Sequence, residues 1–227
     1  MFISNTFIKR SYRLCALMLC ELGIALQYAI IAKISNPSIL TCYYTILSNF
    51  VCLFYLAYLL IFNPKKESPF AKGGVVLGIL ITGLIYHFLL NGAMEAGISA
   101  VSQVTFLEVL ANTLVHYITP LLTLLDYLLF TKKGDMHWYH PITWLTLPIA
   151  YVIFILARPS FSDLQFVGFN GLSKYPYPFV DVDQYGLGKV IFMVTAILFA
   201  FLILGYLIFA FDHLLKPRKA TRKTKKK

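Results

Sequence analysis

The chain has 227 residues, of which 59% are hydrophobic and only 13% are charged, and its formal net charge is +10. A soluble domain carries about a quarter charged residues, so this composition excludes an ordinary soluble protein. The four cysteines all lie in apolar stretches, which excludes a disulfide framework and a paired-cysteine metal motif.

Six stretches are apolar and long enough to cross a bilayer, which takes about 20 mainly apolar residues. Glu21 interrupts the first stretch and no small-residue cleavage site follows, so we interpret that stretch as an uncleaved helix. The sequence therefore predicts an all-α polytopic membrane protein, with a six-helix transmembrane domain over residues 1–211 and a disordered basic tail over residues 212–227. The predicted helices cover residues 11–32, 39–62, 73–93, 109–130, 141–158 and 187–211.

The basic residues are distributed unevenly between the two sides of this predicted bundle. Sixteen Lys and Arg residues fall on the side that holds both termini, eight of them in the tail, and only four fall on the other side. The positive-inside rule then predicts that both termini are cytoplasmic in a multi-pass protein of the cell membrane. Anionic lipid is the expected partner of the tail. Nothing else in the sequence supports nucleic acid, the rival partner for a basic tail.

Polar residues gather in the outer half of the predicted bundle. The segment "CYYTILSNF", residues 42–50, places Thr45, Ser48 and Asn49 at i, i+3 and i+4, on one face of the second helix. Thr45 and His87 lie about 9 Å from the outer ends of their helices, and His116 about 10 Å, at 1.5 Å per residue. Three reactive side chains from three helices thus fall at one level.

The fourth helix carries a second polar pattern, because Glu108, Asn112 and His116 are spaced i, i+4 and i+8. Pro120 frees the carbonyl group of His116, four residues earlier. A threonine hydroxyl needs a base to become a nucleophile, and a neutral imidazole can take its proton. We therefore expect Thr45 to be the nucleophile and His116 the base.

Other side chains complete this hypothesis. Amides such as Asn49 or Asn112 can donate to a developing oxyanion. Ser48 supports the same helix face, and His87 is a neighbouring residue or the alternative base. Alternatively, Thr45 and Ser48 bond only to carbonyls of their own helix, and the amides only link helices.

Two further points stay open at the level of sequence. Zinc would accept His87, His116 and Glu108, but these residues lack a tight motif, so no metal or cofactor is expected. Asp126 is either a solvated helix cap or a partner of Lys132.

The outer connection between the fifth and sixth helices, residues 159–186, is long for a helical bundle. Its segment "YPYPF" contains Tyr175 and Tyr177 and acts either as a gate over the site or as an aromatic anchor at the membrane interface. Arg158 is predicted to pair with Asp181 and to fold the connection back over the bundle.

The segments "YYTILSNF", "GLIYHFLL", "ANTLVHYITPLLTLLDYLL", "WLTLPIAYVIFILAR" and "YPYPFVDV" occur in the order seen in bacterial Pr6Pr-type membrane proteins. The chain resembles that family from about residue 40 to about residue 190, and the family is distantly similar to the androgen-induced membrane proteins of animals. Those are six-helix intramembrane threonine hydrolases that cleave fatty acid esters of hydroxy fatty acids.

The resemblance implies a lipid ester hydrolase of a bacterial plasma membrane, with Thr45 and His116 at the positions of the family's nucleophile and histidine. The expected substrate-binding residues are Ser48, Asn49, His87, Asn112, Tyr175 and Tyr177. The alternative is a non-enzymatic transporter or lipid-binding protein that uses the same outer cavity.

Overall fold

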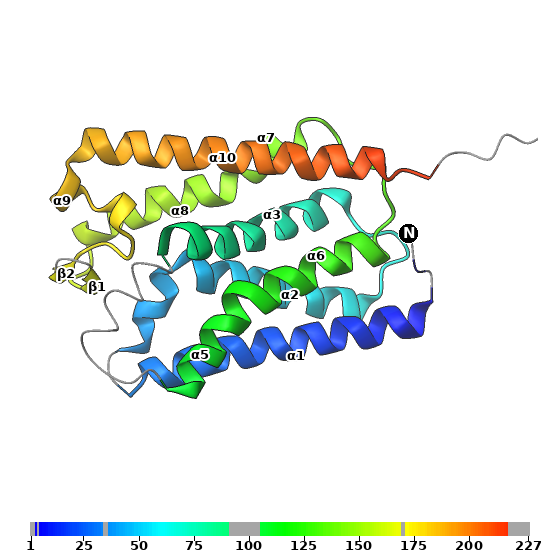
Figure 1. The fold of residues 1–227 in the computed structure, drawn as a ribbon, viewed down its shortest axis with the longest axis horizontal. Helices are drawn as coiled ribbons and strands as arrows, with labels where there is room; N and C mark the ends of the chain where they lie inside the picture. Colours follow the sequence, from blue (N-terminus) through cyan, green and yellow to red (C-terminus); the bar gives the residue numbers. More distant parts are fainter. Residues whose placement is uncertain (1–2, 4, 34–35, 91–104, 169–170, 218–227) are drawn as a thin grey trace, which may run out of the picture.

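A computed structural model describes residues 3, 5–33, 36–90, 105–168 and 171–217 of the chain. Six long helical rods run side by side and form one bundle (Figure 1). The first three are α1 (Thr6–Ile31), α2 (Tyr44–Phe62) and α3 (Pro69–Ile85) with its extension η2 (Tyr86–Leu90). The other three are α5 (Phe106–Thr113) with η3 (Leu114–Ile118) and α6 (Thr119–Phe130), α7 (His140–Trp144) with α8 (Thr146–Ala157) and η4 (Arg158–Ser160), and α10 (Leu187–Leu214).

All six rods are long and apolar enough to cross a membrane, so the prediction of a six-helix multi-pass bundle is confirmed at the level of the fold. The main difference lies at the second helix, which begins at Tyr44 and not at residue 39. The side chain of Asn36 caps a 3-10 turn, η1 (Pro37–Cys42), and the backbone of Tyr43 is extended. Thr45 therefore lies in the first turn of α2, closer to the end of the helix than the sequence suggested.

The fourth rod is not a regular α-helix. Its middle section, η3, has π-helical hydrogen bonding and ends directly before α6, whose second residue is Pro120. The missing amide of the proline removes a normal helical bond, and single π-turns of this kind are common at functional sites. His116 lies inside η3.

The two ends of the bundle differ in what they carry. Helix α1 begins and helix α10 ends at the same end of the bundle, which we call the terminal end (Figure 1). The opposite, loop end carries η1 and the connection from α8 to α10. Which end faces the cytoplasm stays a prediction from charge. Of the predicted tail, residues 212–214 continue α10, and residues 218–227 lie outside the described residues.

The connection at the loop end folds back onto the bundle. It contains a short antiparallel hairpin of β1 (Phe166–Gly168) and β2 (Gly171–Ser173), the 3-10 turn η5 (Pro178–Val180) and the short helix α9 (Val182–Tyr185). Its side chains Phe166, Tyr175, Tyr177 and Val180 are buried in one cluster with Tyr151 of α8.

The predicted ion pair between Arg158 and Asp181 is wrong. Arg158 is buried and donates to the backbone carbonyl of Lys174 and to the Ser162 hydroxyl. Asp181 accepts instead from the Ser173 hydroxyl at 2.6 Å and from the Gln184 amide at 3.0 Å, capping α9. The arginine still folds the connection back, but it does so through a carbonyl group, which no pairing of charges in the sequence reveals.

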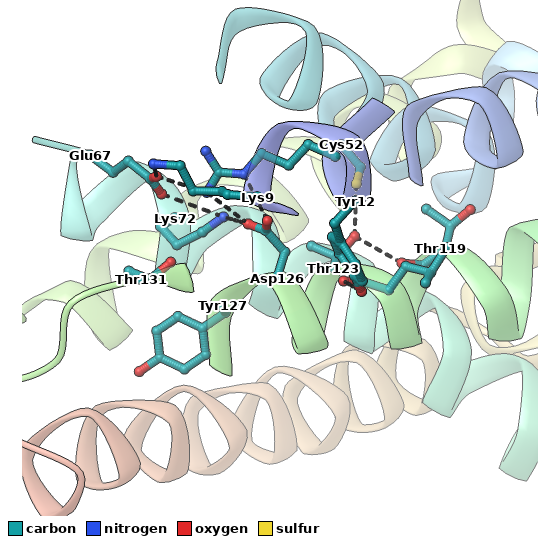
Figure 2. A network of polar contacts seen from close by, with 12 residues as sticks. Lys9, Tyr12, Cys52, Glu67, Lys72, Thr119, Thr123, Asp126, Tyr127 and Thr131 are labelled. Atoms are coloured by element: carbon teal, nitrogen blue, oxygen red, sulfur yellow. Dashed lines mark hydrogen bonds and ion pairs between the residues drawn. The ribbon is translucent and has the colours of Figure 1, made fainter. Parts of the chain in front are cut away.

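The terminal end is held by a group of four charged side chains, which we call the ionic cluster: Arg13, Glu67, Lys72 and Asp126. Three of them are buried and Glu67 is partly buried; Figure 2 labels Glu67, Lys72 and Asp126. Arg13 Nε donates to Asp126 Oδ1 at 2.7 Å, and its Nη2 donates to Glu67 Oε1 at 2.7 Å. Lys72 donates to Asp126 Oδ2 and lies 3.7 Å from Glu67 Oε2. Both alternatives considered for Asp126 are therefore wrong, because it is fully buried and joins α1, α3 and α6.

Glu21, which interrupts the first helix, lies on the exposed surface of α1. The loop between α6 and α7 is tied to α10 through Asp212, whose Oδ2 accepts from the amides of Gly134 at 2.8 Å and Met136 at 3.1 Å. Asp212 is buried, and its other oxygen accepts from the Tyr127 hydroxyl at 3.2 Å. This second acidic anchor of the terminal end was not recognised from the sequence.

Candidate functional site

Thr45 and His116 meet in the loop-end half of the bundle. The Thr45 hydroxyl Oγ1 lies 3.3 Å from His116 Nε2, although the two residues are 71 positions apart in the chain. Thr45 is half-buried in the first turn of α2, and His116 is buried in η3. The distance suits a nucleophile and a base without substrate, where such contacts are often slightly long.

The other ring nitrogen of His116 determines its tautomer. Nδ1 lies 3.0 Å from the backbone carbonyl oxygen of Asn112. A carbonyl oxygen only accepts hydrogen bonds, so Nδ1 carries the proton and Nε2 presents its lone pair to Thr45. The backbone of the fourth rod thus holds the imidazole in the form that a general base requires.

Neighbouring residues also contact the ring face and the backbone carbonyl of His116. The ring of Tyr86, from η2, stacks on it with centroids 3.8 Å apart and planes inclined by 18°. The carbonyl of His116, which Pro120 leaves free, faces Gly83 of α3. A Cβ atom at Gly83 would lie 2.7 Å from that oxygen, so only glycine allows α3 to come this close. Sequence reasoning missed both residues, although the glycine preceding "LIYHF" was a usable signal.

Tyr177 of the connection lies at the start of α2. Its ring packs against those of Tyr43 and Tyr151, with centroids 5.7 and 6.4 Å away, and it lines the same cavity as Thr45. Burial raises the pKa of Tyr177, and polar groups of Thr45, Tyr44 and Tyr151 oppose the rise. The first amides of a helix have no partner within it, so the start of α2 beside Thr45 favours an oxygen atom that accepts hydrogen bonds from them.

An apolar cavity opens directly beside Thr45. Its volume is about 50 Å³, which is below the roughly 300–1,000 Å³ of drug-sized ligand sites and leaves room for only a few atoms. Thr45, Thr82 and Tyr177 supply polar groups at one part of the wall, and the remaining lining is aliphatic and aromatic. The apolar side chains include Ile85, Val152, Val194, Ile197, Leu198 and Phe201.

The other predicted residues of the second helix are close to the pair but turned to neighbouring helices. Ser48 Oγ lies 2.6 Å from the Thr82 hydroxyl and bonds the Thr45 carbonyl at 3.0 Å. Asn49 is fully buried, and its Nδ2 donates to the carbonyls of Thr45 at 2.8 Å and Val115 at 3.1 Å. Both amide protons are therefore engaged, and Asn49 joins α2 to η3.

The remaining predicted residues lie farther from the pair. Asn112 Oδ1 accepts from Gln27 of α1 at 2.9 Å, so its side chain faces α1 and only its carbonyl reaches His116. His87 is exposed, with Nδ1 3.3 Å from the Tyr117 hydroxyl. Tyr175 is buried in the aromatic cluster of the connection and does not line the cavity beside Thr45.

The zinc arrangement considered from the sequence is not assembled. Glu108 closes a capping box with Thr105 at the start of α5, and His87 is exposed. Within the described part of the chain, no three His, Cys, Asp or Glu residues are grouped so that they could hold a metal ion.

Comparisons of this chain with models of protein families, with curated proteins and with solved structures find no match.

Proposed function

We propose that the protein is an intramembrane hydrolase of lipid esters, with Thr45 as nucleophile and His116 as general base. The observation that carries this proposal is the 3.3 Å contact between Thr45 Oγ1 and the unprotonated Nε2 of His116. A hydroxyl next to an imidazole whose other nitrogen is fixed by an acceptor is the arrangement that activates a nucleophile.

The reaction proceeds in two halves. Thr45 Oγ1 attacks the ester carbonyl carbon while its proton passes to His116 Nε2, and an oxyanion forms. The bond to the alcohol oxygen then breaks, and His116 returns the proton to the departing alcohol. A water molecule next attacks the acyl-threonine, gives its proton to Nε2 and releases the carboxylic acid and the free Thr45 hydroxyl.

The start of α2 supplies the groups that favour the oxyanion. The first backbone amides of α2 have no partner within the helix, and the helix dipole adds partial positive charge there. The substrate carbonyl oxygen would accept from these amides, with the nearby Tyr177 hydroxyl as a further donor. This replaces the earlier hypothesis of amide donors, because the Asn49 side chain is engaged with carbonyl groups and Asn112 faces Gln27.

The cavity supports an acyl chain as the part of the substrate that is bound. Its lining is almost entirely apolar, and the polar groups gather near Thr45. A long fatty acyl ester, such as the fatty acid esters of hydroxy fatty acids that the resemblance suggests, would place its ester at Thr45, the carbons next to the ester in the cavity and the rest of its chain in the surrounding lipid. Such a substrate is already dissolved in the membrane.

The test uses the purified full chain and a fluorophosphonate probe of serine and threonine hydrolases. We expect labelling of Thr45, located by peptide mass spectrometry, and hydrolysis of a long-chain fatty acid ester. Thr45→Ala should lose both, whereas Thr146→Ala should keep both because its exposed hydroxyl only bonds the Thr143 carbonyl. Binding of the ester without hydrolysis by the wild-type protein would contradict the proposal and favour the lipid-binding or transport alternative.

A further inference from the structure

A line of buried polar groups lies between the ionic cluster and His116, through the middle of the bundle. We call it the polar seam and define it by seven residues, all of them buried. On η3 and α6 it follows one helix face, at spacings of three and four residues. Its members are His116, Thr119, Thr123 and Asp126 from that rod, Asn49 and Cys52 from α2, and Cys20 from α1.

Most neighbours along the seam touch. Cys52 Sγ lies 3.0 Å from Thr123 Oγ1, and Thr123 donates to the Thr119 carbonyl at 2.8 Å (Figure 2). Cys20 Sγ lies 3.5 Å from the Asn49 carbonyl oxygen. Asn49 then donates to the Thr45 carbonyl at 2.8 Å, so the seam also reaches the backbone of Thr45.

At the terminal end of the bundle, the seam reaches the ionic cluster. Asp126 lies one helical turn from Thr123, on the same face of α6. Of the cluster, Glu67 is partly accessible at its edge, and Lys9 approaches it to 3.8 Å with a side chain that is 21% exposed. The seam therefore starts at a charged mouth at the terminal end.

One group in the seam has no partner within the protein. The Thr119 hydroxyl oxygen is buried and makes no hydrogen bond, although it lies among polar neighbours. A buried hydroxyl without a partner is unfavourable, and ordered water is the usual partner of such groups. The seam thus provides polar surroundings and an unpaired donor one helical turn from His116.

We propose that the polar seam is a water-accessible path from the terminal end of the bundle to His116. Hydroxyl, thiol and amide groups along it take part in hydrogen bonds with water, and the ionic cluster keeps its mouth hydrated. This path would supply the water that cleaves the acyl-threonine and would exchange protons with His116, and that role rests on the proposed hydrolysis. The existence of the path does not depend on the hydrolysis.

Two native thiols in the seam make the proposal testable in the full chain. Ag⁺ reacts with thiols and is small enough to follow a file of water. The protein is held in lipid nanodiscs and exposed to Ag⁺ in chloride-free buffer. It is then denatured and alkylated, and each cysteine is quantified by peptide mass spectrometry. Cys15, exposed on the apolar face of α1, and Cys42, buried at the loop end, are internal controls.

We expect Cys52 and Cys20 to react with Ag⁺ at least ten times faster than Cys15 and Cys42. Thr119→Val, which removes the unpaired hydroxyl and keeps the side-chain shape, should slow the reaction of Cys52 several-fold. Thr119→Ser should restore it, and Thr143→Val at the exposed surface of α7 should have no effect. Equally slow reaction of all four cysteines, or an unchanged rate in Thr119→Val, would overturn the path.

The outcome separates this proposal from the proposed function. Loss of hydrolysis in Thr45→Ala with unreactive Cys52 would leave the hydrolase and remove the path. Fast reaction of Cys52 in a protein without hydrolase activity would leave the path and remove the hydrolase.

Discussion

The bundle contains two polar regions at opposite ends of its core, and they are built differently. At the terminal end, the ionic cluster joins two cations to two anions, so each charge has more than one partner. At the loop end, Thr45 and His116 share a single contact between neutral groups. The cluster is suited to fixing helix positions, whereas the pair leaves lone pairs and a hydroxyl proton available for chemistry. The same fold thus separates a region suited to stability from the region where we propose that the reaction takes place.

The largest expected effect is on hydrolysis when the pair is broken. Thr45→Ala and His116→Ala should each lower kcat/KM by about 10²- to 10⁴-fold, because a nucleophile without its base, or a base without its nucleophile, does not react. The double variant should be no more than about tenfold worse than either single one, since the two groups act as a unit. The measurement is the hydrolysis rate of a long-chain ester. Additive losses would show that the two residues act separately.

Breaking the ionic cluster should lower the stability of the protein. Asp126→Asn removes a buried carboxylate and leaves Arg13 and Lys72 with Glu67 alone, which should lower the free energy of unfolding by about 3–5 kcal/mol. Asp135→Asn is the matched control, because Asp135 meets only Lys66 and Lys132, both exposed, at 3.9 and 3.8 Å. That change should cost at most about 1 kcal/mol. Equal losses in a denaturant titration in detergent would remove the contrast between buried and surface pairs.

A smaller effect on hydrolysis should follow from a substitution at a neighbouring residue that shifts His116. A methyl group at Gly83 would press on the His116 carbonyl oxygen, so Gly83→Ala should turn the imidazole away from Thr45. Because small misplacements of a catalytic group are costly, we expect roughly a tenfold or greater loss of kcat. Gly188→Ala in α10 is the control, since a Cβ atom there meets nothing within 4 Å. Unchanged kcat in Gly83→Ala would show that the imidazole position is not set from α3.

The sequence predicted the pair but not the cluster, for a physical reason. Hydropathy defines where each helix crosses the membrane, and the level of Thr45 and His116 within their helices follows from counting residues. Arg13 and Lys72 lie near helix ends, where basic residues normally face water and anionic lipid, so they counted as orientation signals. Their inward direction depends on how α1, α3 and α6 rotate against one another. No periodicity within a single helix contains that information.

Residues that act from other elements were missed for the same reason. The stacking of Tyr86 on His116 and the approach of Tyr177 to the start of α2 arise only after the helices pack and the connection folds back. For Asn49 and Asn112 the sequence predicted polar side chains in the correct half of the bundle. It did not reveal which hydrogen bonds they already make, and those bonds decide whether an amide is free for substrate.

The smallest expected effect concerns a buried cation of the terminal end that has no carboxylate in direct contact. Lys133, in the loop between α6 and α7, donates to the carbonyls of Tyr127 and Thr131, and its Nζ lies 3.5 Å from the centre of the Tyr127 ring. Burial lowers the pKa of Lys133 to about 8. In the unfolded chain the ammonium keeps its proton until about pH 10.4, so between these values the unfolded state binds more protons. The free energy of unfolding should therefore rise with pH from about 8 to about 10.4.

Lys133→Met should remove this rise, because methionine fills similar space and does not titrate. The measurement is the difference between wild-type and Lys133→Met unfolding free energies across that pH range, so that other titrating groups cancel. Lys132→Met, next in the chain but 71% exposed, should leave the rise intact. A flat difference for Lys133→Met would mean that its ammonium is as well stabilised as the cations of the ionic cluster. The terminal end would then owe its stability to carbonyl and aromatic contacts as much as to its carboxylates.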